Sequence, residues 1–147
     1  MQPKIMVKDE LLIAGLSGNG SDTGAVWAEF DKRYKANPFS ELNENGYEVR
    51  YSDGGIHIGF TVSDNFAGFS SLLLPAAEYA VFDVYVAKGY DSGNTAMDQW
   101  LADNADTYSQ LELDGRKYVV EFYGERFKGG NHPDSVVQIW IPLVRRG

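Results

Sequence analysis

The chain of 147 residues has no cysteine. This absence excludes a disulfide framework, thiolate metal ligands and a cysteine nucleophile. Histidine is also scarce: His57 and His132 stand alone, without the carboxylate spacing of a metal site, so we expect neither a metal nor another cofactor. The sequence lacks a Gly-x-Ser-x-Gly motif as well, which counts against a serine hydrolase of the α/β type.

Long apolar runs are missing too. No stretch approaches the length of a membrane-spanning helix, and the N-terminus lacks the apolar core of a signal peptide, so we expect a cytoplasmic protein without membrane contact. Basic residues are outnumbered by acidic ones: 13 Lys and Arg stand against 21 Asp and Glu, and the formal net charge is therefore −8. That deficit counts against direct nucleic-acid binding, which depends on neutralising phosphates.

What the sequence contains is typical of one folded domain. It is 44% hydrophobic and 14% aromatic, well above the composition of disordered chains. Its length suits a single domain, or two half-domains that share a core. We expect residues 1–147 to form one domain with half-units at about residues 10–64 and 72–146.

The two half-units show the same order of patterns. Each begins with an apolar run typical of a buried strand, passes through a Gly-rich loop into a Trp-bearing helix, and ends with two strands. The expected strands lie at about residues 11–16, 47–51, 56–62, 79–87, 117–123 and 136–144, and the expected helices at about residues 24–36 and 94–108.

A repeated β-α-β-β order predicts an α+β fold of two antiparallel sheets, each with a helix on one face. Alternation along the last strand leaves Gln138 and Trp140 on the face away from the helix. On the preceding strand we expect Tyr118, Val120 and Phe122 to pack under the helix, with Glu121 and Tyr123 on the helix-free face. The helix-free faces would then form the walls of a central cleft, a favoured place for ligands.

Glu121 is the carboxylate expected among aromatic residues in that cleft, at the position that Arg50 holds in the first half. It is either a ligand-contacting acid or half of an ordinary ion pair with Arg50, and such a pair would count against small-molecule binding. His57 aligns with Gln138 and is a further candidate for the cleft. Trp100 lies on an apolar helix stripe, as a core residue would, and is a candidate for the cleft border.

Five short segments resemble the GyrI-like small-molecule-binding family, the effector-binding domain also attached to AraC- and MerR-type transcription regulators. Residues 75–82 (PAAEYAVF) are similar to the family's PAGxYAVF, and residues 26–30 (VWAEF) to its LWxxF. Residues 100–101 match its WL, residues 121–123 (EFY) its ExY, and residues 138–143 (QIWIPL) its EIWIPI. The resemblance covers about residues 10–145.

The resemblance implies a tandem of two such units around a central cleft that binds lipophilic, often cationic, compounds against an acid flanked by aromatics. By position the acid is Glu121, flanked by Tyr123 and Trp140. Gln138 departs from the family, which often has a glutamate there, so one possible acidic contact is lost. No helix-turn-helix precedes the domain, so we expect a stand-alone version that does not bind DNA through that motif.

Three functions follow as hypotheses. The preferred one is binding of an amphipathic, cationic or aromatic small molecule in the cleft. The second, implied by the resemblance, is hydrolysis of reactive electrophiles of the cyclopropane-bearing type, with Glu121 and Tyr123 activating a water. The third is a gyrase-inhibitor-like module whose acidic surface contacts a protein partner, either gyrase or a regulator.

Overall fold

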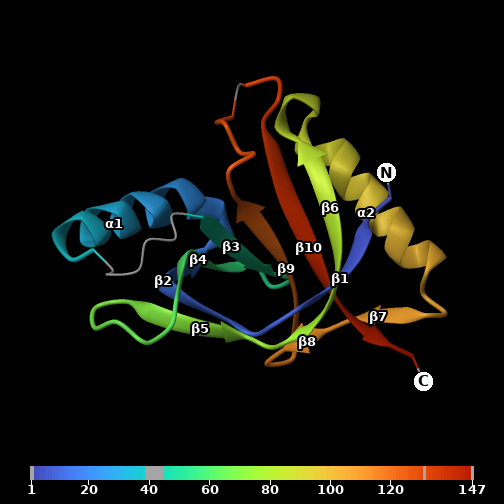
Figure 1. Ribbon diagram of the computed structural model, residues 1–147, viewed down its shortest axis with the longest axis horizontal. Coiled ribbons are helices and arrows are strands. Elements are labelled where there is room, and N and C mark those ends of the chain that lie inside the picture. The colour runs from blue at the N-terminus through green and yellow to red at the C-terminus, as the bar shows by residue number, and fades with distance from the viewer. Residues whose placement is uncertain (1, 39–44, 131, 147) are drawn as a thin grey trace.

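The computed structural model describes residues 2–38, 45–130 and 132–146 (Figure 1). The helices are α1 (Thr23–Ala36) and α2 (Tyr90–Asp103), with the short 3₁₀ turns η1 (Gly20–Asp22) and η2 (Val86–Lys88). The strands are β1 (Lys4–Lys8), β2 (Leu11–Asn19), β3 (Gly46–Tyr51), β4 (Gly55–Val62), β5 (Ser70–Leu74), β6 (Ala77–Tyr85), β7 (Tyr108–Gln110), β8 (Glu112–Leu113), β9 (Arg116–Tyr123) and β10 (Val136–Arg145). Among the described residues, no helix is long and apolar enough to cross a membrane.

The α+β class and the tandem β-α-β-β order are confirmed, as β2-α1-β3-β4 and β6-α2-β9-β10. The two expected sheets are joined into one, however, with strand order β1-β6-β10-β9-β3-β4-β2-β5 across the described residues. The equivalent strands β3 and β9 pair antiparallel at its centre, from Gly46↔Tyr123 to Tyr51↔Tyr118 (Figure 1). The pairing satisfies two strand edges that separate sheets would leave with unpaired backbone groups.

Four strands lie outside the alternating pattern of the sequence: β1, β5, β7 and β8. In β1, Ile5, Met6 and Val7 are all exposed, so burial does not alternate along the strand. β1 nevertheless pairs antiparallel with β6 and extends the sheet beyond the second half. Its backbone pairing, rather than its side chains, makes it a strand.

Both helices cover the same face of the sheet. Residues directly opposite each other in paired strands share a face, and the register links Phe82, Ile139, Glu121, Glu48 and Ile58 in one row. Phe82 and Ile139 belong to the core under α2, whereas Ile58 belongs to the core under α1. The two glutamates therefore lie on the helix-bearing face, between the areas that the two helices cover.

The next row faces the other way and fills the interior of the curled sheet. It contains Val81, Trp140, Val120, Val49 and His57, all of them buried. The expectation that Val120 and its neighbours in β9 pack under a helix is wrong for this reason. Alternation correctly separates the two faces of β9, but the helix-bearing face is the one that carries the glutamate.

Candidate functional site

A pocket of about 560 Å³ lies on the helix-bearing face, where the β3–β9 centre of the sheet is open between the helices. Its floor includes Glu48, Arg50 and Glu121, while Thr23 comes from α1 and Asn94 from α2. We call it the polar lobe. Because its lining comes from both halves, the site exists only where the two repeats meet.

A second pocket of about 450 Å³ adjoins it and shares Glu48 and Tyr123 with it. Its other walls include Trp27, Phe60 and Phe127, so we call it the aromatic lobe. The two lobes together form a trough that is charged at one end and aromatic at the other. Such a surface suits an amphipathic molecule.

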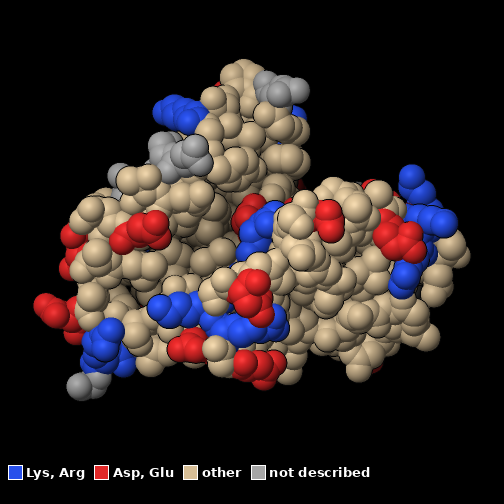
Figure 2. Space-filling view, turned by 180° about the vertical axis from the view of Figure 1, so that it is seen from behind, with Lys and Arg blue, Asp and Glu red and all other residues tan. Residues whose placement is uncertain are grey.

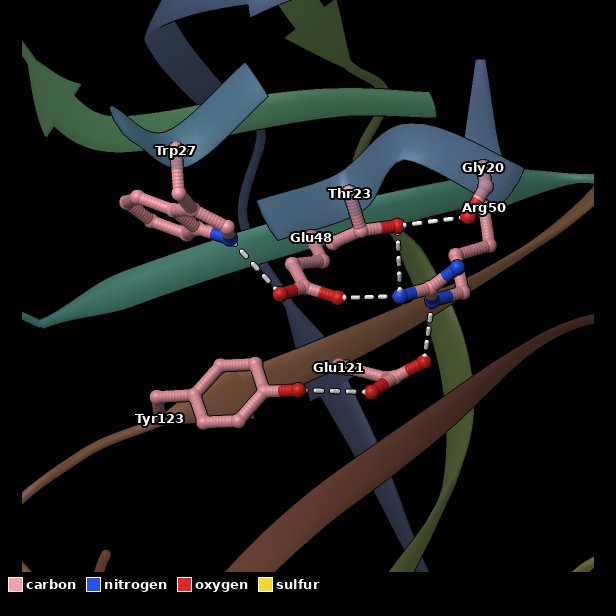
Figure 3. Close-up of polar contacts among 7 residues, drawn as sticks. All are labelled: Gly20, Thr23, Trp27, Glu48, Arg50, Glu121 and Tyr123. Atoms are coloured by element: carbon pink, nitrogen blue, oxygen red, sulfur yellow. Dashed lines mark hydrogen bonds and ion pairs between the residues drawn. The ribbon is translucent and has the colours of Figure 1, made fainter. Parts of the chain in front are cut away.

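Two carboxylates and one guanidinium form the floor of the trough (Figure 3). Nη2 of Arg50 donates to Oε1 of Glu48 at 2.7 Å, and Nε of Arg50 lies 2.5 Å from Oε2 of Glu121. Glu48 and Glu121 are direct partners in the β3–β9 register, whereas Arg50 pairs with Val119 and so reaches Glu121 diagonally. The cluster carries one net negative charge when all three groups are ionised.

Glu48 lines both pockets but was not among the residues expected at the site from the sequence. It is 5% exposed, and its second oxygen, Oε2, accepts a hydrogen bond from Nε1 of Trp27 at 2.7 Å. Alternation in residues 47–51 already places Glu48 on the same face as Arg50. What the sequence lacks is the register that brings β3 against β9, and with it Glu48 against Glu121.

Glu121 is held from two sides. Oε1 accepts a hydrogen bond from the Tyr123 hydroxyl at 2.8 Å, while Oε2 contacts Arg50 (Figure 3). Burial raises the pKa of Glu121, and the Tyr123 hydrogen bond and the Arg50 charge offset this only in part. Burial and the neighbouring Glu121 charge also raise the pKa of Tyr123, so its hydroxyl keeps its proton and remains a donor.

Arg50 also connects the floor to the start of α1. Its Nη2 lies 3.3 Å from Oγ1 of Thr23, and that hydroxyl donates to the Gly20 carbonyl at 2.7 Å. The side chain of Asn19 accepts the backbone N–H of Ser21 at 2.9 Å and so stabilises the turn that leads into the helix. This local turn chemistry places Thr23 at the polar lobe.

Two residues expected beside Glu121 lie on the opposite face. Trp140 is in the row that fills the curled interior, where it stacks on Phe122 with ring centroids 5.3 Å apart. Gln138 lies on the same face and accepts a hydrogen bond from Nε1 of Trp140 at 3.0 Å. Because Ile139 directly opposes Glu121, its neighbours on either side in the strand must face away from Glu121.

His57 and Trp100 also lie outside the trough. His57 is 3% exposed; Nε2 lies 2.9 Å from the Ile13 carbonyl and Nδ1 3.1 Å from Oγ of Ser17, and burial lowers its pKa. Trp100 packs on the core under α2 and stacks on Tyr108. Of the seven residues expected at the site, the structure brings together Arg50, Glu121 and Tyr123.

Within the described part of the chain, no group of three or more His, Asp or Glu side chains is arranged to hold a metal ion. No buried side-chain nitrogen or oxygen of the described residues is left without a hydrogen-bond partner either. The charged side chains on the floor of the trough therefore satisfy one another's hydrogen bonds. A ligand cation would have to replace one of these side chains as a partner of the carboxylates.

Solved structures share this fold, although no family model and no curated protein matches the chain. The structure of SAV2435 bound to tetraphenylphosphonium matches with a TM-score of 0.62 and 16% identity, covering 98% of this chain and 94% of that one. A cryo-EM structure of an EcmrR–DNA complex matches with a TM-score of 0.73 and 13% identity, over 99% of this chain and 58% of that one. A hydrolase from Listeria innocua matches with a TM-score of 0.61 and 10% identity, over 97% and 92%.

At these identities the similarity concerns the fold. The chain has the fold that these structures share, and this fold is consistent with the resemblance of its five sequence segments to the GyrI-like family.

Proposed function

We propose that the trough binds an amphipathic small molecule that carries a positive charge, with residues of both half-units, about 10–64 and 72–146, acting as one binding domain. The observation that supports this most directly is the excess of carboxylates over guanidinium on a floor bordered by aromatic rings. The side chains of Glu48 and Glu121 are only 7% and 13% exposed, so their charge is weakly screened by water. Aromatic faces beside such a charge add cation–π attraction.

The Arg50–Glu121 ion pair bears on this proposal, because it neutralises one of the two acids. One negative charge remains on the cluster after that pairing, and a cation entering the trough meets the field of the whole group. The tetraphenylphosphonium in the SAV2435 structure is a lipophilic cation of the kind this arrangement would attract. The ion pair lowers the affinity expected for a cation, but the net negative charge that would attract the cation remains.

Titration with tetraphenylphosphonium, followed by tryptophan fluorescence, tests the proposal. Trp27 borders the aromatic lobe, so binding is expected to quench its emission, whereas neutral triphenylphosphine oxide should quench much less. Two unit charges 4 Å apart interact by about 4 kcal/mol at an effective dielectric constant of about 20. Since Arg50 offsets part of this, we expect Glu121→Gln to weaken binding at least about fivefold.

Glu78→Gln is the matched control, because the same atoms change in a carboxylate that pairs with Arg145 outside the trough. Its affinity for tetraphenylphosphonium should equal that of the wild type. Equal quenching by the cation and the neutral oxide, or unchanged affinity in Glu121→Gln, would refute charge recognition by the trough.

A hydrolase is the second candidate, and the Glu121–Tyr123 pair favours it. A carboxylate with a raised pKa is a better general base at neutral pH. It could accept a proton from a water molecule that attacks the ring carbon of a cyclopropane conjugated to a carbonyl. The ring electrons would move to the carbonyl oxygen, which takes up a proton. Formation of more than one equivalent of ring-opened product, lost in Glu121→Gln, would favour this candidate over simple binding.

The protein-interaction hypothesis relies on the acidic surface instead. On the face shown in Figure 2, acidic side chains alternate with Lys and Arg and do not gather into one continuous patch. That face therefore has no continuous acidic patch that a protein partner could recognise. The proposal of small-molecule binding in the trough is preferred for this reason.

A further inference from the structure

The place where a ligand cation would meet both carboxylates is already filled by a cation of the protein. The Arg50 guanidinium bridges two neighbouring strands, with Nη2 on Glu48 of β3 and Nε on Glu121 of β9 (Figure 3). A planar guanidinium presents its N–H groups as a fork, and here two N–H groups of the fork each find a carboxylate oxygen. The two acids therefore form a receptor with the shape and charge of an amidinium or guanidinium site.

The acids are fixed more firmly than the arginine. Glu48 also accepts from Trp27, and Glu121 also accepts from Tyr123, each through the oxygen that Arg50 does not use. The Arg50 side chain is 32% exposed and has, among the described residues, one further partner, the Thr23 hydroxyl at 3.3 Å. When the cluster exchanges partners, the arginine is the member that can leave.

We infer that Arg50 is an internal stand-in for the ligand's cation, and that the ligand class of the trough is an aromatic amidinium or guanidinium that replaces it. This inference rests on the proposed function. An amidinium reproduces both hydrogen-bonded ion pairs, and its aromatic body extends past Tyr123 toward Trp27 and Phe127 in the aromatic lobe. A quaternary ammonium or phosphonium has no N–H. It would be attracted by the negative charge of the two carboxylates but could not donate hydrogen bonds to them.

Removing a residue that contacts a ligand ordinarily weakens binding. Arg50 should have the opposite effect, because it competes with the ligand for the two carboxylates. Removal of the arginine should strengthen binding, because the ligand no longer displaces an equivalent group. It should do so most for a cation that has the forked N–H donors. Arg50 is in this sense a specificity-determining residue that limits affinity.

Calorimetric titration of Arg50→Ala with benzamidine and with phenyltrimethylammonium tests the inference. Both probes carry one positive charge on one benzene ring, and only benzamidine has the fork. We expect benzamidine to bind Arg50→Ala about tenfold more tightly than it binds the wild type, with a clearly smaller gain for phenyltrimethylammonium. Arg116→Ala is the control, since Arg116 pairs with Asp53 and stacks on Tyr51 away from the trough, and it should leave both affinities unchanged.

Arg50→Ala leaves two buried acids without their cation, so its melting temperature is measured with and without benzamidine. A rise produced by millimolar benzamidine that is clearly larger in the variant than in the wild type is the expected rescue. If the variant does not fold in either condition, Arg50→Lys decides: it keeps the charge, lacks the fork, and should still bind benzamidine more tightly than the wild type.

Equal gains for the two probes would show an effect of net charge alone and overturn the inference. Weaker binding of benzamidine to the variants than to the wild type would overturn it too, because Arg50 would then be helping the ligand. In either case, wild-type binding of tetraphenylphosphonium that depends on Glu121 would leave the proposed function standing. If neither probe nor tetraphenylphosphonium binds wild type or variant, both proposals fail.

Discussion

Replacing Glu48 by glutamine tests whether the ionic floor stabilises the fold, in addition to the binding role proposed for it. Both oxygens of Glu48 accept from donors: Oε1 from Arg50 and Oε2 from Trp27, each at 2.7 Å. Glutamine has one acceptor oxygen and one NH₂ group. Whichever way it turns, its NH₂ group faces either the indole N–H or the guanidinium, and two donors then oppose each other in a site that is 5% exposed.

The cost follows from those contacts. A hydrogen bond to a charged group contributes about 1.5–3 kcal/mol, and a buried donor left unsatisfied costs about 1–3 kcal/mol. Part of this overlaps, because the side chains adjust, so we expect Glu48→Gln to lower the free energy of unfolding by about 3 kcal/mol. For a domain of this size, that corresponds to a melting temperature lower by about 6–12 °C.

Thermal and urea unfolding of Glu48→Gln and of the wild type measure this difference, and the emission of Trp27 reports the lost indole contact. Glu78→Gln makes the same chemical change in an exposed ion pair and should leave the melting temperature nearly unchanged. A melting temperature of Glu48→Gln equal to that of the control would refute the reasoning. It would mean that the buried carboxylate does not stabilise the β3–β9 centre of the sheet.

Two further predictions concern charge and backbone packing. Because burial raises the pKa of Glu121, its carboxylate loses charge at a higher pH than an exposed glutamate does. Binding of tetraphenylphosphonium should therefore weaken as the pH falls through that raised pKa and recover as it rises, and a titration series from pH 7 to pH 4 should show a dependence that Glu121→Gln lacks. At Gly15 an added Cβ would lie 1.6 Å from the Ile58 carbonyl oxygen, so Gly15→Ala should destabilise the protein by about 3 kcal/mol in urea unfolding. Gly24→Ala, where a Cβ meets nothing within 4 Å in the first turn of α1, should instead raise stability by about 0.5–1 kcal/mol; equal effects at the two sites would contradict the close β2–β4 contact.

The local patterns of the sequence predict much of the fold. The expected helix at residues 24–36 corresponds to α1, and the last two expected strands to β9 and β10. Alternation also separates the two faces of β3, β9 and β10 correctly, including Glu48 and Arg50 together on one side of β3. These features depend on neighbours within a few residues, and such neighbours are visible in a single sequence.

The site is less predictable because it depends on which face of β9 the helices cover. Tyr118, Val120 and Phe122 are apolar on one face, and they pack in the curled interior rather than under α2. A strand between two packed faces has apolar residues on both, as Val119 on the helix side shows. Hydrophobic alternation then identifies two faces without identifying the helix-bearing one, and only the pairing of Ile139 with Glu121 decides.

The pairing of equivalent strands also explains why the chemistry of this site requires the two halves to differ. Arg50 and Glu121 hold equivalent positions in β3 and β9, and antiparallel pairing brings them together as diagonal neighbours at the centre of the sheet. Identical halves would therefore place two arginines or two glutamates in contact, and a poorly solvated site does not keep two like charges ionised. With one of each, the position becomes an ion pair. The equivalent of Glu48 in the second half is Val119, which carries no charge. Glu48 therefore adds a second carboxylate to the ion pair and gives the trough a net negative charge. Duplication places charged positions beside each other, and divergence at Glu48, Arg50 and Glu121 leaves the cluster with one net negative charge.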